Sequence, residues 1–531
     1  MEHYLKIIER SVKNNWQQPA LSDYQEETHY TYGEMALEVE RVKEWMCRLG
    51  IKRGDKVAIC GKSCANWGVS YLSIVTSGCV AVSILPDFTE ENILYLVRHS
   101  EAKLLFVGES VKRKICESDF GNTLVINMER WESVSQNQNL PPICQRQNQC
   151  QNLDWHTDLN LDDIALINYT SGTTDKPKGV MITSRALSSN VMFGLKGQPN
   201  GPGDQVLGML PLAHIFGIMF DFLYQIAGGT HIVYLKKAPT PTLIMKAFHE
   251  IRPYMILTVP LLIEKIINSR VLPVMNKPTM KMLWHVPTFR CIIRRKILGK
   301  LKAAFGGRLR VMIIGGAPLN TEVERCLKKL HFSFTCGYGM TECAPLICYA
   351  SPETMKTGSV GRAVDGIEIK INSEEPTNKP GEILVRGDNV FVGYFANQDA
   401  TDNAFDSDGW FHTGDMGIVD QLGNLTLKGR CKNMILGPSG QNIYPEEIEA
   451  KLLTMPRVLE TIVISRDKKI IALVYPDNNG IDREELRLLM GENLTLLNAS
   501  LPKYSQVGKI ELVEQEFEKT PKKSIKRYLY K

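Results

Sequence analysis

The sequence lacks the features that mark secreted, membrane-spanning and zinc-binding proteins. Its 13 cysteines include no CxxC pair and no Cys/His spacing suited to zinc, and no secretory leader follows Met1. The two most apolar stretches, 68–86 and 209–220, are diluted by small residues or interrupted by His214, so neither predicts a membrane span. These absences favour a cytoplasmic protein with reduced thiols, whose membrane contact would be peripheral, at the inner face.

A strong charge excess is also missing. The net charge of +5 and the pI near 8.4 could favour anionic ligands or membrane surfaces but are too small for a nucleic-acid-binding footprint. Hydrophobic residues make up 44% and charged residues 23%, which excludes disordered and fibrous classes. A chain of 531 residues predicts two or more domains.

Helical and strand patterns alternate through the first hundred residues, which predicts an α/β domain with a largely parallel sheet. The expected helices cover 32–49, 67–77 and 90–99, and the expected strands cover 56–60, 80–84 and 104–107. The Gln- and Asn-rich stretch 136–152 predicts a surface loop.

The pattern changes after Lys428-Gly429-Arg430. A helix is expected over 445–453, strands over 461–465 and 470–475, and a helix from Asp482. We therefore predict a large domain of layered, largely parallel sheets with helices over 1–429, and a small, mobile α+β lid domain over 430–531.

Hydroxyls, glycines and lysines are concentrated between Tyr169 and Gly179, directly after the apolar run 164–167. Turns of this kind expose backbone N–H groups, and hydroxyl and lysine side chains add donors and charge, which suits a polyphosphate. Val180 follows Gly179, so the segment is not a Walker loop. A flexible surface turn is the alternative. The candidate ligands are Thr170, Ser171, Gly172, Thr173, Thr174 and Lys178.

A second segment, Gly337-Tyr338-Gly339-Met340-Thr341-Glu342, offers an aromatic face for a base, a hydroxyl for a phosphate and a carboxylate for Mg²⁺. Alone it is equally typical of a tight turn. In this order, however, the two segments closely resemble the phosphate loop and the adenine and magnesium segment of the adenylate-forming superfamily, which includes acyl-CoA synthetases, firefly luciferase and peptide-synthetase adenylation domains.

The resemblance implies that Tyr338 stacks on adenine, that Thr341 contacts the α-phosphate and that Glu342 holds Mg²⁺. It adds Gly315, Gly316 and Ala317 as the turn beside adenine and the acyl tunnel. It also implies that Asp415 and Arg430 bind the ribose and that Lys432 is the hinge of the lid. Without these neighbours, Asp415 is more typical of a turn and Arg430 of a surface cation.

Two positions depart from the superfamily pattern. Asp175 stands where the phosphate loop usually has glycine, and Ser524 stands at the place of the catalytic lysine that ends the lid. A hydroxyl cannot offset the charge between a carboxylate and a phosphate. We expect the adjacent Lys523 to supply that charge, with Lys526 as the alternative; a basic tail in solvent is the other interpretation.

The segment 210–217 resembles the border of the acyl pocket, with His214 near its mouth, and small residues such as Gly316 and Ala344 would leave room for a chain. A lone histidine is otherwise most often a core residue. The segment 305–310 resembles long-chain fatty acid CoA ligases more than aryl or amino-acid activators. The resemblance thus predicts a medium- or long-chain fatty acid as substrate, with ATP, Mg²⁺ and coenzyme A.

The stretch 289–310 interleaves apolar and basic residues and predicts a basic amphipathic helix, which could lie on a membrane or pack its apolar stripe on the domain. Two alternatives to a CoA ligase stay open. The first is an acyl-adenylate-forming ligase that loads a carrier protein, which the lack of an attached carrier domain disfavours. The second is a weakened protein that holds ATP or an acyl group, suggested by Asp175 and Ser524.

Overall fold

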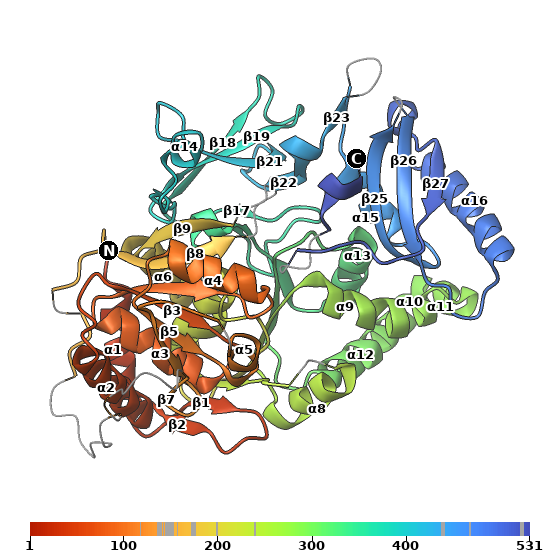
Figure 1. The fold of residues 1–531 in the computed structure, drawn as a ribbon. Coiled ribbons are helices and arrows are strands. Elements are labelled where there is room, and N and C mark those ends of the chain that lie inside the picture. Colours follow the sequence, from red (N-terminus) through yellow and green to blue (C-terminus); the bar gives the residue numbers. More distant parts are fainter. Residues whose placement is uncertain are drawn as a thin grey trace.

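The computed structural model describes residues 1–116, 118–134, 141, 143, 153–156, 158–170, 177–197, 200–237, 240–436, 441–466, 469–520 and 525–530. A large unit contains two extensive sheets with helices, and a small unit follows Arg430. Figure 1 shows the small unit, in blue, beside the large one. The α/β prediction with a small α+β unit is therefore confirmed. The loop predicted at 136–152 falls almost entirely outside the described residues.

The eight-stranded sheet has the order β20-β9-β8-β4-β3-β5-β6-β7. Its central strands from β8 to β6 are parallel, and its outer strands are antiparallel. The expected strands at 56–60, 80–84 and 104–107 are β3, β4 and β5. The strands are β3 (Lys56–Cys60), β4 (Val80–Ile84), β5 (Leu104–Val107), β6 (Leu124–Asn127), β7 (Glu132–Ser133), β8 (Ile164–Thr170), β9 (Lys178–Thr183) and β20 (Gly393–Tyr394).

The seven-stranded sheet has the order β14-β13-β12-β10-β11-β1-β2 and is parallel except for the pair of β1 with β2. Its carboxyl ends face the site described below. The strands are β1 (Pro19–Asp23), β2 (His29–Thr31), β10 (Gln205–Gly208), β11 (His231–Tyr234), β12 (Met255–Thr258), β13 (Val311–Ile314) and β14 (Phe334–Cys336).

The helix α3 lies between these two sheets, because it contacts β1 of one and β3 and β4 of the other. All of its residues are buried, so it is apolar around most of its circumference. The helices α2 and α4 cover 32–48 and 90–99, as expected from the sequence. The helices of the first half are α1 (Tyr4–Asn14), α2 (Tyr32–Arg48), α3 (Ala65–Thr76), α4 (Glu90–His99), α5 (Glu109–Lys114), α6 (Ser184–Gly197), the π-helix η1 (Gly217–Leu223) and α7 (Tyr224–Gly228).

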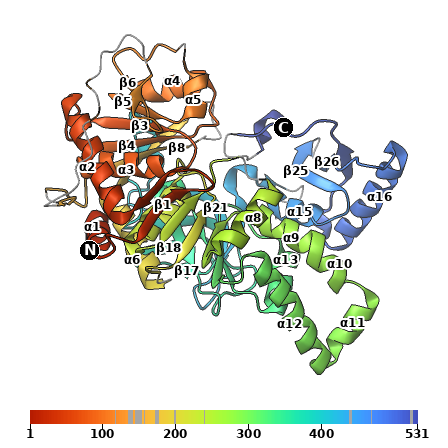
Figure 2. The ribbon, with the colours of Figure 1, turned by 90° about the horizontal axis from the view of Figure 1, so that it is seen from below.

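A run of helices follows β11 and leads to a projecting hairpin, α11 with α12, which Figure 2 shows extending from the large unit. The helix predicted over 289–310 is α12, but it ends at Ala304 because Gly306 and Gly307 adopt φ angles of +83° and +81°. The helices are α8 (Pro241–Ile251), α9 (Pro260–Ile266), η2 (Ile267–Val271), α10 (Leu272–Met275), α11 (Pro278–His285), α12 (Pro287–Ala304), α13 (Thr321–Leu330), η3 (Thr341–Cys343) and α14 (Gln398–Asp402).

Two smaller antiparallel sheets complete the large unit. One contains β15 (Tyr338–Gly339), β16 (Leu346–Tyr349) and β17 (Arg362–Ala363); the other contains β18 (Ile367–Asn372), β19 (Gly381–Gly387), β21 (Phe411–Val419) and β22 (Leu425–Arg430). The short helix η4 (Cys431–Asn433) follows β22 directly.

The small unit is built on a three-stranded sheet, in which β25 pairs with β26 antiparallel and β26 pairs with β27 parallel. Among the described helices, none combines the length and the hydropathy needed to cross a bilayer. The elements of the small unit are β23 (Ile435–Leu436), β24 (Asn442–Ile443), α15 (Pro445–Leu452), β25 (Val458–Arg466), β26 (Lys469–Pro476), α16 (Arg483–Ala499), η5 (Lys503–Ser505), β27 (Lys509–Leu512) and η6 (Arg527–Tyr530).

Candidate active site

The carboxyl ends of four parallel strands of the seven-stranded sheet meet at one edge. The segments at the ends of β10, β12, β13 and β14 carry His214, Leu257, Gly315 and Gly337, which all line one pocket. Ligand sites of α/β proteins form where strand ends converge in this way. The sheet topology thus brings together residues that are far apart in the sequence.

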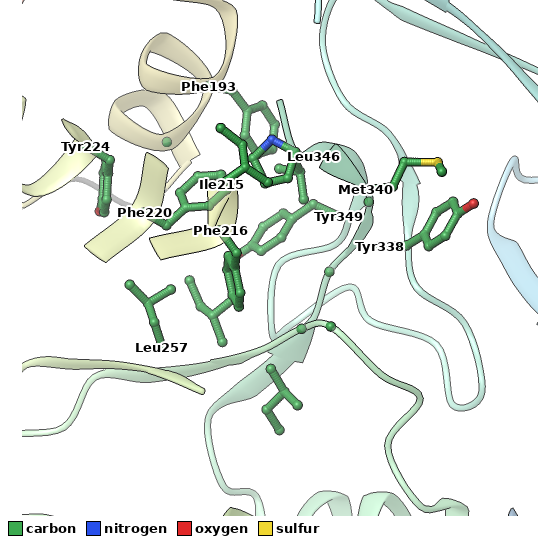
Figure 3. A pocket seen from close by; sticks show the side chains of 18 of the residues that line it. Phe193, Ile215, Phe216, Phe220, Tyr224, Leu257, Tyr338, Met340, Leu346 and Tyr349 are labelled. Atoms are coloured by element: carbon green, nitrogen blue, oxygen red, sulfur yellow. The ribbon is translucent and has the colours of Figure 1, made fainter. Parts of the chain in front are cut away.

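The pocket encloses about 790 Å³ of empty space, its open mouth included. Figure 3 shows the rings of Phe193, Phe220 and Tyr224 around it, while the Tyr338 hydroxyl points away. Lining residues are Phe193, Gly194, Gly197, His214, Ile215, Phe216, Phe220, Tyr224, Leu257, Ile313, Ile314, Gly315, Gly316, Gly337, Tyr338, Gly339, Met340, Pro345, Leu346 and Tyr349. The expected pocket residues His214 and Gly316 are among them. Ala344 is fully buried, and its neighbour Pro345 takes its place in the wall.

The turn after β13 needs glycine at two positions. A side-chain carbon on Gly315 would lie 3.1 Å from the ring of Phe216, and Gly316 adopts a φ of +84°. The Phe216 ring therefore packs directly over the turn. Ala317 is exposed and does not line the pocket.

The π-helix η1 holds the segment that carries His214. Its Asp221 carboxylate accepts hydrogen bonds from the backbone N–H groups of Met209 and Leu210, at 3.1 and 2.9 Å. Asp221 is 1% exposed, and burial raises its pKa to about 7. Widened π-turns are frequent at functional sites. Asp221 is thus a buried anchor for one wall of the pocket.

Asp221 makes the stability of the protein depend on pH. Because its folded pKa lies above its unfolded value, its stabilising contribution is complete below about pH 4 and is lost as the pH rises through 7. We expect Asp221→Asn to remove this dependence. The free energy of unfolding of the wild type relative to the variant should fall by about 4 kcal/mol between pH 4 and pH 8, at about 1.36 kcal/mol per pKa unit.

Denaturant unfolding at a series of pH values measures this difference. Asp408→Asn is the control, because Asp408 is exposed and its curve should run parallel to that of the wild type. A constant difference between wild type and Asp221→Asn across this range would contradict the assignment.

A buried carboxylate joins the expected adenine and ribose residues. Asp415 is 8% exposed, accepts a hydrogen bond from the Tyr338 hydroxyl at 2.8 Å and lies 3.1 Å from the Arg430 Nε. Asp415 and Arg430 are direct partners in the β21–β22 ladder, which explains their proximity. Burial raises the pKa of Asp415, and the Arg430 charge opposes that rise.

The residues expected at the phosphates and at Mg²⁺ also converge. The Glu342 carboxylate accepts a hydrogen bond from the Tyr394 hydroxyl at 3.0 Å, and the Lys178 Nζ lies 4.8 Å from the centre of the Tyr394 ring. The pairing of β20 with β9 brings Tyr394 there. Thr170 lies opposite Lys178 in the β8–β9 ladder. The ladder thus pairs the two ends of the predicted phosphate loop, and Tyr394 links the Lys178 end to Glu342.

The turn at η3 requires close backbone approach. A side-chain carbon on Gly339 would lie 1.9 Å from the Pro345 carbonyl oxygen, which accepts a hydrogen bond from the Met340 N–H at 2.8 Å. Thr341 is 5% exposed. Gly339 and Met340 line the pocket on one side of this turn, and Glu342 belongs to η3 itself.

The predicted hinge residue Lys432 lies in η4, and side chains on either side of it contact the helix α15. Asn433 donates to Glu446 at 2.6 Å, and Lys428 pairs with Glu447 at 2.9 Å. The structure therefore connects the end of the large unit with the first helix of the small unit through polar contacts.

Several predicted ligands lie outside the described residues: Ser171, Gly172, Thr173 and Thr174 of the phosphate loop, and Lys523 of the tail. The alternative tail lysine, Lys526, is described. Its Nζ lies 3.3 Å from a Glu518 oxygen, and the neighbouring Arg527 pairs with Glu449.

Sequence reasoning missed Tyr394 and the aromatic residues Phe193 and Tyr224. Tyr394 follows Gly393, but nothing in the local sequence links it to Glu342. Phe193 and Tyr224 belong to helices α6 and α7, and only the packing of these helices brings both rings to one pocket.

Comparison with known protein families gives one match over most of the chain. The family model described as AMP-binding enzyme matches residues 8–395. The chain belongs to this family. The family that the resemblance predicts is therefore confirmed, and the matched range includes the segment around Tyr338.

Curated relatives act on different acids. A long-chain-fatty-acid–CoA ligase, FadD15 of Mycobacterium bovis, is 28% identical over 484 residues, covering 85% of this chain and 78% of that ligase. A 4-coumarate–CoA ligase of Vanilla planifolia is 26% identical over 514 residues, covering 91% of this chain and 85% of the ligase.

Solved structures share the fold. The anthranilate CoA ligase AuaEII in complex with anthranoyl-AMP superposes with a TM-score of 0.80 at 20% identity, covering 99% of this chain and 96% of that one. The o-succinylbenzoate CoA synthetase of Bacillus subtilis with AMP gives 0.75 at 23% identity, covering 99% and 98%. At these identities the likeness establishes the architecture alone.

The ribose-binding role that the resemblance implies for Asp415 predicts a defect in nucleotide binding when this carboxylate is changed. Asp415→Asn removes the charge that faces Arg430, and a hydrogen bond to a charged group contributes about 1.5–3 kcal/mol. We expect the variant to raise the KM for ATP about 10- to 100-fold in an AMP-release assay. Tyr338→Phe is the matched variant, because it removes the hydroxyl and keeps the ring, and its effect should be smaller. An unchanged KM in Asp415→Asn would contradict the assignment.

Proposed function

We propose that the chain activates a medium- or long-chain fatty acid with ATP, through an acyl-adenylate, and transfers the acyl group to coenzyme A. The acid–CoA ligase reaction rests on the AMP-binding family and on curated relatives that are themselves CoA ligases. The identity of the acid rests on the pocket.

The pocket favours an acid with a hydrocarbon tail. Among its described lining residues there is no Asp, Glu, Lys or Arg, and most are aliphatic, aromatic or glycine. A second carboxylate in the substrate would lose its hydration there without gaining a charged partner. An apolar chain gains about 25 cal/mol for each Å² that it buries. This lining is the observation that carries the proposal.

The nucleotide would bind along the adjoining wall. We assign adenine to Tyr338 with the Gly315–Ala317 turn, the ribose hydroxyls to Asp415 and Arg430, and the polyphosphate to Thr170, Lys178 and the loop between them. Burial raises the pKa of Tyr338 well above its usual range, so its hydroxyl stays a hydrogen-bond donor to Asp415.

The Glu342 carboxylate suits Mg²⁺, because it is a hard oxygen ligand that contacts the Tyr394 hydroxyl, and Lys178 lies against the ring of the same tyrosine. Bound there, Mg²⁺ would supply positive charge against the polyphosphate. Thr341 at the adjacent turn would donate to the α-phosphate.

The reaction has two steps. The substrate carboxylate attacks the α-phosphorus, and pyrophosphate leaves as the acyl-adenylate forms. The thiolate sulfur of coenzyme A then attacks the acyl carbon, and AMP leaves as the thioester forms. We propose that the unit after residue 429 is a lid, which rotates about Lys432 between these steps.

The eleven described cysteines are free thiols, which fits a reducing compartment such as the cytoplasm.

A panel of acids tests the substrate. Acetate, octanoate, palmitate, oleate and 4-coumarate are each incubated with ATP, Mg²⁺ and coenzyme A, and the thioester is quantified by chromatography. We expect the highest kcat/KM with an acid of eight carbons or more. Glu342→Gln is the negative control.

Other outcomes separate the alternatives. A preference for 4-coumarate would replace the fatty acid by an aryl acid. Pyrophosphate release without thioester would favour a carrier protein as acceptor, and no release with any acid would favour a protein that only binds ATP or an acyl group.

The tail lysines are tested singly. Lys523→Ala should lower the rate of adenylate formation about 100-fold or more, because it removes the positive charge expected to stabilise the transition state between the carboxylate and the α-phosphate. The rate at which added acyl-adenylate and coenzyme A give thioester should stay unchanged. Lys522→Ala and Lys526→Ala are matched controls. A loss confined to Lys526→Ala would transfer the role to Lys526, and three unchanged rates would remove the tail from catalysis.

A further inference from the structure

The hairpin of α11 and α12 has few buried residues. The helix α11 has none and α12 has only Leu301, whereas the neighbouring helix α13 buries five residues. Helices in water owe most of their stability to packing of an apolar face. The hairpin projects from the large unit (Figure 2), so most of its surface is available to a partner.

The two halves of α12 differ in their surroundings. Ile297, Leu298 and Leu301 pack against the core around α8 and α13. The packing interpretation of the sequence thus holds for the second half of the helix. Phe289 and Ile292 of the first half stay 48% and 61% exposed.

The exposed face combines apolar and cationic side chains. Phe289, Ile292, Lys296 and Lys300 are spaced by three, four and four residues, which places them along one side of the helix. Met282 of α11 adds a side chain that is 74% exposed. Apolar tips beside long cationic side chains are typical of helices that lie at a lipid interface.

The charge of the surrounding segment has one sign. Residues 265–321 contain twelve Lys and Arg residues and no Asp or Glu. Of these cations, only Arg310 forms an ion pair with a carboxylate among the described residues, to Asp204 at 3.1 Å. The remaining charge is therefore available to an anionic partner.

We propose that the α11–α12 hairpin docks on the surface of an anionic lipid bilayer, with Met282, Phe289 and Ile292 inserted at the headgroup boundary and the α12 cations on lipid phosphates. A projecting tip suits a flat surface better than a protein groove, and charge complementarity selects anionic lipid. The chain from β12, whose Leu257 lines the acyl pocket, leads through the exposed Val259 and Leu261 to this hairpin.

The test is cosedimentation of the full chain with vesicles of equimolar phosphatidylglycerol and phosphatidylcholine, and with phosphatidylcholine alone. We expect binding to the anionic vesicles only, and binding that weakens as salt rises. Equal binding to both vesicle types, or binding to neither, would overturn the proposal.

Two sets of substitutions locate the contact. Arg290→Gln, Arg295→Gln, Lys296→Gln and Lys300→Gln together should weaken partitioning about 100-fold or more, since each cation near an anionic leaflet contributes about fivefold. Met282→Ser, Phe289→Ser and Ile292→Ser together should also release the protein. All the substituted side chains are exposed, so the melting temperature of both variants should equal that of the wild type.

Matched controls lie on other surfaces. Four exposed cations, changed together as Lys6→Gln, Lys52→Gln, Arg487→Gln and Lys503→Gln, alter the net charge equally, and Leu488→Ser with Leu496→Ser removes exposed apolar side chains of α16. Both should bind vesicles like the wild type. A loss of binding in the controls equal to that in the hairpin variants, or a hairpin-dependent dimer in sedimentation velocity without vesicle binding, would overturn the proposal. Because vesicle binding needs no substrate, its failure is distinguishable from failure of the ligase reaction.

Discussion

The arrangement of the site depends on the contacts of the Asp415 carboxylate with Tyr338 and Arg430. The carboxylate is buried, it accepts the Tyr338 hydroxyl, and it faces the Arg430 guanidinium at the last residue of β22. The next residues form η4, which contains Lys432. One charged group therefore joins the wall proposed for adenine to the segment that leads into the small unit, and the low exposure of Asp415 strengthens both contacts.

The apolar pocket and the wall proposed for the nucleotide share a boundary. Gly339 and Met340 line the pocket, and Tyr338 turns its hydroxyl toward Asp415 on the other side (Figure 3). Only glycine fits at position 339, because the Pro345 carbonyl occupies the space of a side chain. An acid in the pocket would thus meet the nucleotide at this short turn, which is the proximity that adenylate formation requires.

Much of the fold and part of the site could be predicted from the sequence. Strands β3, β4 and β5 have the predicted bounds, because short apolar runs between turns define buried parallel strands. The motifs around Tyr338 and Asp415 identify the family because their chemistry is local. The contact of Tyr394 with Glu342, the anchor at Asp221 and the rings of Phe193 and Tyr224 could not be predicted, since each depends on packing between distant segments. The amphipathic pattern over 289–310 predicts a helix that is too long, because the pattern continues past Gly306 and Gly307, whose positive φ angles end α12 at Ala304.

Formation of an acyl-adenylate is tested most directly by exchange of labelled pyrophosphate into ATP without coenzyme A. The proposed function predicts exchange that requires both Mg²⁺ and a fatty acid and that is lost in Glu342→Gln, because it assigns Mg²⁺ to Glu342 and the acid to the apolar pocket. Absence of exchange with every acid, in a protein that still binds ATP, would contradict this function.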